Sequence, residues 1–144
     1  MTGDPAVSTL AGVASPMVGE ALTDAISAVI AGLYRQFYGH DRTTATTYVN
    51  DNVVLCVLED ILTTSESRLV TFGCSQEVID GRITFQSNTQ DAFTAAVEKL
   101  TARRVVAFLS ANQTTPGCGC ELFFLDGEEG RSIAAAVPSA GAER

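Results

Sequence analysis

The residues with the most reactive chemistry in this chain are four cysteines, of which Cys118 and Cys120 are separated by a single glycine. Two thiolates this close could bind a soft metal ion, with Cys74 or His40 completing the site. Zinc sites, however, usually pair cysteines two to four residues apart and need a second pair, which the sequence lacks. We therefore expect a tight glycine hairpin in which one cysteine enters a strand as a small apolar residue, and we predict no metal and no cofactor.

Nucleophilic catalysis needs a base beside a nucleophile, and the sequence offers one histidine, His40. It follows the first predicted helix, where a cation offsets the unpaired carbonyls of the helix end. Cys56 lies in the apolar run 53–58, and burial there raises the pKa of a thiol and makes it inert. We predict no catalytic residues and a protein that is not an enzyme.

Charged residues offer two further candidates. Arg103 and Arg104 form the basic cluster of the chain, and their position after a predicted helix favours a role in offsetting its last carbonyls. Together with Arg42 they could instead bind a small phosphate, a carboxylate or acidic residues of a partner. Glu59 and Asp60 are adjacent, so on a strand they point in opposite directions, and two carboxylates fall short of the oxygens that calcium takes.

Composition bounds the class of protein. The chain has 144 residues, of which 46% are hydrophobic and 18% are charged, and its net charge is −8. This predicts an acidic globular domain over residues 16–126, between a mobile N-terminal arm (1–15) and a flexible C-terminal tail (127–144). The negative charge disfavours nucleic acid and anionic lipid. Because no membrane-spanning run and no basic signal-peptide start are visible, we expect a cytoplasmic chain without direct lipid insertion.

The helices that would position these residues are visible in the apolar spacing. A stripe from Val18 to Phe37 at spacings of three and four predicts a helix that starts at Ser15-Pro16 and stops at Gly39. Thr63 and Glu66 have the spacing of a reciprocal capping box, which predicts a second helix that runs to Gly73 and buries Leu69, Val70 and Phe72. Residues 75–102 form one long helix or two, and we favour one because a single apolar face persists.

Strands are predicted at 44–48 and 53–58, joined at Asp51-Asn52, and at 105–110 and 121–125. The order of elements is thus α-β-β-α-(α)-β-β. It predicts an α+β two-layer sandwich with helices packed on one face of a mostly antiparallel four-stranded sheet. The predicted core comprises Leu22, Ile26, Val29, Leu33, Phe37, Val53, Leu55, Val57, Leu69, Phe93, Val97, Leu100, Val106, Phe108, Leu122 and Phe124.

Association is predicted from the surplus of apolar positions. One layer of helices cannot cover every apolar residue of such a sheet, and the first helix adds a face of small residues that would let another helix approach. We predict a homodimer, with Ala21, Ala25 and Ala28 as candidate interface residues.

Spaced apolar, aromatic and glycine positions over residues 20–126 resemble the MpsC family. The residues that carry the resemblance are Leu33-Tyr-x-x-Phe-Tyr-Gly39, Thr47-Tyr48, the run 53–58, Leu62-Thr63, Glu98-x-Leu100-Thr101 and the run 103–109. The family is named for a sodium-translocating, membrane-potential-generating system, in which it is the small soluble component. The resemblance supplies no catalytic residues.

Because the sequence shows no nucleophile–base pair and no firm metal spacing, we favour a non-catalytic accessory or regulatory protein. The resemblance implies that it works beside a membrane cation (Na+) or bicarbonate transport system. Attachment to a membrane transport subunit would be by protein contact, through the apolar face of the first helix or the arginine end of the hairpin. The alternative is a small-anion or small-ligand sensor that uses Arg103 and Arg104.

Overall fold

The computed structural model describes residues 17–127. The predicted arm (1–15) and the predicted tail beyond Gly127 lie outside these residues. The elements are α2 (Gly19–Tyr38), β1 (Thr44–Asn50), β2 (Val53–Glu59), α3 (Thr64–Thr71), α4 (Ser75–Thr101), β3 (Val105–Gln113) and β4 (Cys118–Leu125).

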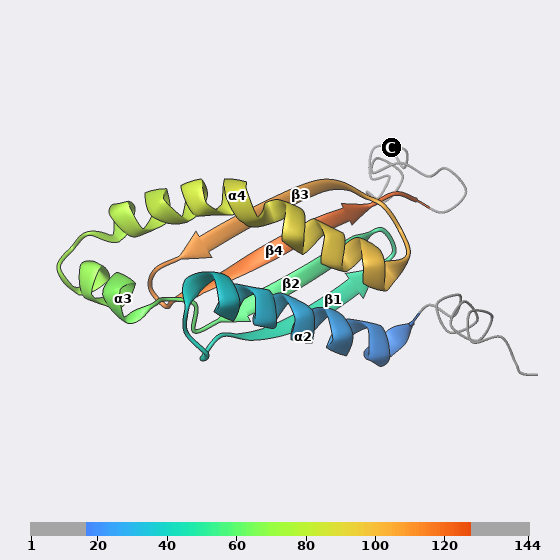
Figure 1. The fold of residues 1–144 in the computed structure, drawn as a ribbon, viewed down its shortest axis with the longest axis horizontal. Coiled ribbons are helices and arrows are strands. Elements are labelled where there is room, and N and C mark those ends of the chain that lie inside the picture. Colours follow the sequence, from blue (N-terminus) through green and yellow to red (C-terminus); the bar gives the residue numbers. More distant parts are fainter. Residues whose placement is uncertain (1–16, 128–144) are drawn as a thin grey trace, which may run out of the picture.

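The strands form one open antiparallel sheet in the order β1-β2-β4-β3, in which two hairpins are joined through β2 and β4. Helices α2 and α4 pack side by side over one face of this sheet, and α3 packs on α4 beyond the end of the strands (Figure 1). The predicted fold class, an α+β protein with helices on one face of an antiparallel sheet, is confirmed.

Local signals explain where the helices begin and end. Helix α2 stops because Gly39 adopts a left-handed conformation (φ 76°) and its N–H donates to the carbonyl of Arg35. The predicted start at Ser15-Pro16 falls outside the described residues. At α3 the capping box is confirmed: the Glu66 N–H donates to the Thr63 hydroxyl (3.1 Å), and the Thr63 N–H donates to the Glu66 carboxylate (2.9 Å). Residues 75–101 form one helix, as favoured.

The core lies between the two helices and the sheet, but the predicted side of the sheet was wrong. The residues of β2 that face the helices are Val54, Cys56 and Leu58, and those of β4 are Glu121, Phe123 and Leu125. Five predicted core residues therefore lie on the opposite face: Val53, Leu55, Val57, Leu122 and Phe124. The run 53–58 is apolar at every position, so its pattern alone cannot choose a side.

Three apolar residues that we placed inside are exposed, Phe72 most of all. Leu69 and Phe72 lie on or just after α3, which has no fully buried residue, and Phe72 is 78% exposed. Val106 lies beside an irregularity in the pairing of β3 with β4 and is also exposed. By contrast, Ile26, Phe93 and Val97 are buried as predicted.

Candidate functional site

Arg82 is the least expected side chain of the core. It lies in the first half of α4 and is 1% exposed. Its guanidinium donates two hydrogen bonds to the carboxylate of Glu66 on α3, from Nε to Oε2 (2.9 Å) and from Nη2 to Oε1 (2.6 Å). This forked geometry joins the two helices with a charge-assisted pair.

The Arg82 guanidinium makes two further hydrogen bonds, and its flat face has a partner too. Nη2 donates to the Ile61 carbonyl (2.5 Å), and Nη1 donates to the Tyr34 hydroxyl. The guanidinium carbon lies 4.1 Å from the centre of the Tyr38 ring, within cation–π range. Arg82 therefore ties α4 to α2, to α3 and to the loop that follows β2.

Glu121 is a second buried charged residue, on the helix-facing side of β4, and it is 2% exposed. One carboxylate oxygen accepts from the Ser110 hydroxyl (3.1 Å), and the other, Oε1, is buried without a hydrogen-bond partner. Burial raises the pKa of Glu121 from 4.5 to about 7, although Ser110 and the charge of Arg82 both act to lower it. We call Arg82, Glu66, Tyr34, Tyr38 and Glu121 the Arg82 cluster.

The electrostatics of the cluster favour a bound, ionised pair at its centre. Burial alone would raise the pKa of Glu66, but hydrogen bonds from Arg82 and Thr63 outweigh it and hold that pKa below its usual value. Burial would lower the pKa of Arg82, yet the same bond to Glu66 raises it. The Tyr34 hydroxyl in turn donates a hydrogen bond to the side-chain oxygen of Asn112 on β3 (3.2 Å). The charged groups of the cluster therefore bind other residues of the chain and link its elements.

Arg42 and His40 hold the same loop from the other side. Arg42 donates to the Leu62 carbonyl (2.9 Å) and pairs with the Asp60 carboxylate at 3.6 Å, while His40 Nε2 lies 3.2 Å from the Ile61 carbonyl. A cleft of about 610 Å³ beside them is lined by Arg35, Gly39, His40, Asp41, Arg42 and Thr64. His40 thus contacts the loop after β2, in addition to following the end of α2.

The structure does not bring Arg42 together with Arg103 and Arg104. Arg42 precedes β1, whereas Arg103 bonds to Asp51 and Asn52 in the turn after that strand. The Arg103 guanidinium donates to the Asp51 carbonyl (3.0 Å), the Asn52 side-chain oxygen (2.5 Å) and the Asp126 carbonyl (2.8 Å). Arg103 thus fastens the β1–β2 turn to the end of β4, and Arg104 is exposed.

This difference gives a matched pair of variants. Arg103→Ala is expected to lower the free energy of unfolding by roughly 1.5–3 kcal/mol, because three acceptors lose a charged donor. Arg104→Ala removes the same side chain from an exposed position and is expected to change that free energy by no more than about 0.5 kcal/mol. Urea unfolding followed by circular dichroism measures both, and equal losses would contradict the assignment of Arg103 to the turn.

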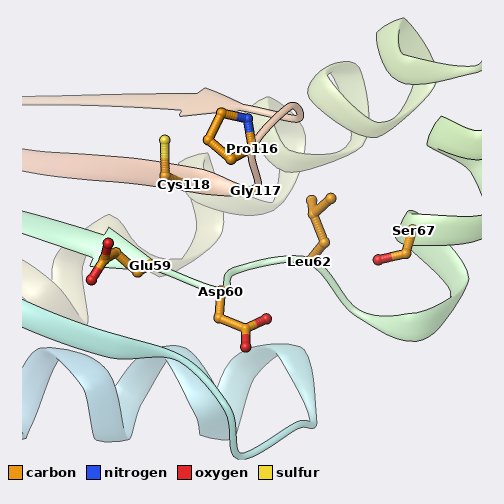
Figure 2. Close-up of a pocket in the computed structure, with 7 residues that line it drawn as sticks. All are labelled: Glu59, Asp60, Leu62, Ser67, Pro116, Gly117 and Cys118. Carbon is orange, nitrogen blue, oxygen red and sulfur yellow. The ribbon is translucent and has the colours of Figure 1, made fainter.

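Glu59, Asp60 and Cys118 line a cleft of about 340 Å³ where the loop after β2 meets the β3–β4 turn (Figure 2). Figure 2 shows the two carboxylates pointing in different directions, as expected for neighbours at a strand end. The β3–β4 turn approaches the loop after β2 closely here, because a Cβ on Gly117 would lie 2.9 Å from the Leu62 side chain. Within residues 17–127, no three His, Cys, Asp or Glu side chains gather closely enough to hold a metal ion.

All four cysteines are free thiols. Cys118 and Cys120 lie on the same face of β4, beside a shallow pocket of about 280 Å³ that they share with residues 111–113 and Gly119. Neither Cys74 nor His40 joins them as a third ligand. Cys56 is buried, and burial raises its pKa from 9.0 to about 11, which fits the predicted inert core residue.

On α2, the three alanines proposed as an interface do not share one environment. Ala21 and Ala28 are exposed and Ala25 is half-buried. The helix buries Ile26, Ile30 and Tyr34 instead. An interface at the alanines stays a prediction.

The fold and the site define a class of protein: an open antiparallel sheet with two covering helices and an internal arginine cluster. Within that class the chain belongs to the MpsC family, because the family model described as "Na+-translocating membrane potential-generating system (MpsC)" matches residues 19–127. No curated protein and no solved structure matches the chain. No helix within the described range is both long and apolar enough to span a bilayer.

The sequence analysis missed Arg82, Tyr34 and Glu121 as partners. The available signal was register: Arg82 shares a helix face with Val78, Phe93 and Val97. A charged residue on an otherwise apolar stripe indicates a buried ion pair, and such a residue needs a carboxylate partner.

Proposed function

We propose that this chain is a non-catalytic accessory or regulatory protein of a Na+-translocating, membrane-potential-generating system or a related bicarbonate transport system. It works in the cytoplasm as a homodimer and is held to a membrane transport subunit by protein contact. The link to such a system rests on membership of the MpsC family.

One observation about the described residues supports a binding role over a catalytic one. The arginines with the most hydrogen bonds, Arg82 and Arg103, serve internal acceptors, while large apolar side chains are displayed outward. Phe72 is 78% exposed, Leu109 58% and Tyr48 57%. Tyr48 and Leu109 lie at the two ends of one row across the sheet, with Leu55 and Leu122 between them, and a contiguous apolar surface of this kind favours contact with another protein. Attachment to bare anionic lipid is disfavoured by the net charge of −8.

The small-anion alternative has less support. It depended on Arg103 and Arg104 acting together, and the Arg103 guanidinium already has three acceptors within the chain. Arg104 would have to recognise the anion without the guanidinium of Arg103.

A deletion strain tests the proposed role. Removing the gene is expected to lower the Na+-dependent part of the membrane potential, measured with a potential-sensitive dye across a range of external Na+, and wild-type protein should restore it. An unchanged potential at every Na+ concentration would contradict the proposal.

A variant locates the protein contact in the same strain. Arg104→Glu reverses an exposed charge and leaves the Arg103 bonds intact, so the chain should fold normally. If the Arg103-Arg104 end of the hairpin makes the contact, this variant should no longer be found in the membrane fraction and should fail to restore the potential. Full restoration by Arg104→Glu would remove the arginine end from consideration.

A further inference from the structure

The sheet has a second face that no described element covers. Helices α2 and α4 lie on one side (Figure 1), and the other side carries every second residue of the strands. The register aligns Tyr48, Leu55, Leu122 and Leu109 in one row across all four strands. We call this row and its two neighbours the open sheet face: Asn50, Val53, Phe124 and Ala107 on one side, and Thr46, Val57, Cys120 and Ala111 on the other.

The open sheet face is mostly apolar, with Thr46 and Asn50 as its polar members on the edge strand β1, and its central side chains retain access to solvent. Tyr48 and Leu109, at the two ends of the central row, are more than half exposed. Leu55 and Leu122, on the two middle strands, are partly exposed although they lie in the centre of the sheet. An antiparallel sheet with one solvated face usually alternates apolar and polar residues, and β2 and β4 do not.

Charge identifies the occupant that fits. None of the twelve residues of the open sheet face is charged, and the carboxylate of Glu59 lies in the next row of the same face, at the rim. The whole chain, by contrast, carries a net charge of −8. A partner recognised by charge would find nothing to pair with there. A second copy of this chain presents the same twelve uncharged residues, so two copies can bring these three rows together without opposing carboxylates at the centre of the contact.

The area is also in the range that a dimer needs. Strands lie about 4.8 Å apart and rise about 3.3 Å per residue. Four strands of about seven residues, which include the rim row of Thr44, Glu59, Cys118 and Gln113, give a flat face of roughly 440 Å². Two faces give roughly 900 Å² before side-chain relief is counted, close to the ~1,000 Å² expected of a specific interface.

We propose that two copies of this chain pack their open sheet faces together about a two-fold axis, with Leu55 and Leu122 at the centre of the interface. The product is a four-layer sandwich, helices outside and two sheets inside, packed as in other sheet-on-sheet interfaces. The inference rests on the homodimer proposed above and assigns its surface to the sheet instead of to the alanines of α2.

Two single substitutions test it with the full chain. Tyr48→Lys and Leu109→Lys place an ammonium group at a position that is mostly exposed in one copy, so the fold should persist. In the proposed dimer the same group is buried without a partner, and the dimer dissociation constant should rise at least ~30-fold. Because lysine reduces the net negative charge, dissociation cannot arise from greater overall repulsion.

Phe72→Lys is the matched control, since it makes the same change of charge at an exposed aromatic residue on the helical end. Light scattering and sedimentation equilibrium at micromolar concentration measure the mass, and circular dichroism checks the fold. We expect dimers for the wild type and for Phe72→Lys, and monomers for the two sheet variants.

Two other results would overturn the inference in distinguishable ways. Dimers that survive both sheet variants, and that dissociate with Ala28→Lys, would place the interface on α2 and leave the proposed homodimer standing. A monomeric wild type would mean that no second copy binds this face, and the homodimer would fail with it. The accessory role is then judged by the membrane-potential experiment alone.

Discussion

Replacement of Arg82 by alanine is expected to lower the free energy of unfolding by about 3–5 kcal/mol, the loss expected when one partner of a buried ion pair is removed. The Glu66 carboxylate would lose two charge-assisted hydrogen bonds, and the Ile61 carbonyl and the Tyr34 hydroxyl would lose a donor. The truncation also leaves a cavity beneath the Tyr38 ring.

Urea unfolding at neutral pH, followed by circular dichroism, measures this loss. Arg68→Ala is the matched control, because Arg68 lies on the neighbouring helix α3 and is exposed; its change should stay within about 0.5 kcal/mol. Arg82→Lys should fall between the two, since one ammonium group cannot reproduce the forked contact with Glu66. A loss below about 1 kcal/mol for Arg82→Ala would mean that the buried pair contributes little beyond its own desolvation.

The helices and hairpins could be predicted because their signals are local. Gly39 ends α2 by its own backbone conformation, and Thr63 with Glu66 starts α3 through hydrogen bonds three residues apart. The capping box, however, predicted only one of the two interactions of the Glu66 carboxylate. Its carboxylate also accepts from Arg82, sixteen residues further along, and no local pattern signals that contact.

The side of the sheet could not be predicted, and Glu121 shows why. A glutamate on a strand normally lies on the solvent side, which places its neighbours Leu122 and Phe124 inside. Here Glu121 is itself buried near the charge of Arg82, so Phe123 and Leu125 lie inside with it. The burial of Arg82 on α4 and the burial of Glu121 on β4 thus go together, and both depend on contacts between segments far apart in the sequence.

The side of the sheet that faces the helices also decides where association is expected. With the predicted side, Leu55 and Leu122 would be core residues and the outer face of the sheet would be more polar. With the observed side, they form the middle of an uncharged surface. The surplus of apolar residues was visible in the sequence, but its location depended on which side the buried charges occupy.

Glu121→Gln is expected to stabilise the protein at alkaline pH and to reduce the dependence of its stability on pH. The carboxyl has an ordinary pKa of 4.5 and a pKa of about 7 in the folded chain, because burial penalises its charged form. The folded state therefore holds this proton more tightly than the unfolded state does. The contribution of Glu121 to stability is greatest below pH 4.5 and is lost as the pH rises through 7.

A pKa difference of this size corresponds to roughly 3 kcal/mol or slightly more above pH 8, and the neutral amide of glutamine avoids that cost. Urea unfolding at half-unit steps from pH 5 to 8 should show Glu121→Gln and wild type nearly equal at pH 5 and diverging towards pH 8. Glu66 does not confuse this window, because its pKa is lowered and its own effect falls at more acidic pH.

Glu59→Gln supplies the control, because it removes the same charge from an exposed residue on the adjacent strand β2. Several groups interact with the charge of Glu121 and could mask the effect: Arg82 on α4, Tyr34 and Tyr38 on α2, Cys56 on β2 and Cys120 on β4. Of these, Arg82 favours the ionised carboxylate. If Glu121→Gln destabilised the protein at pH 8, attraction to Arg82 would outweigh burial, and Glu121 would be a third, ionised partner of the cluster.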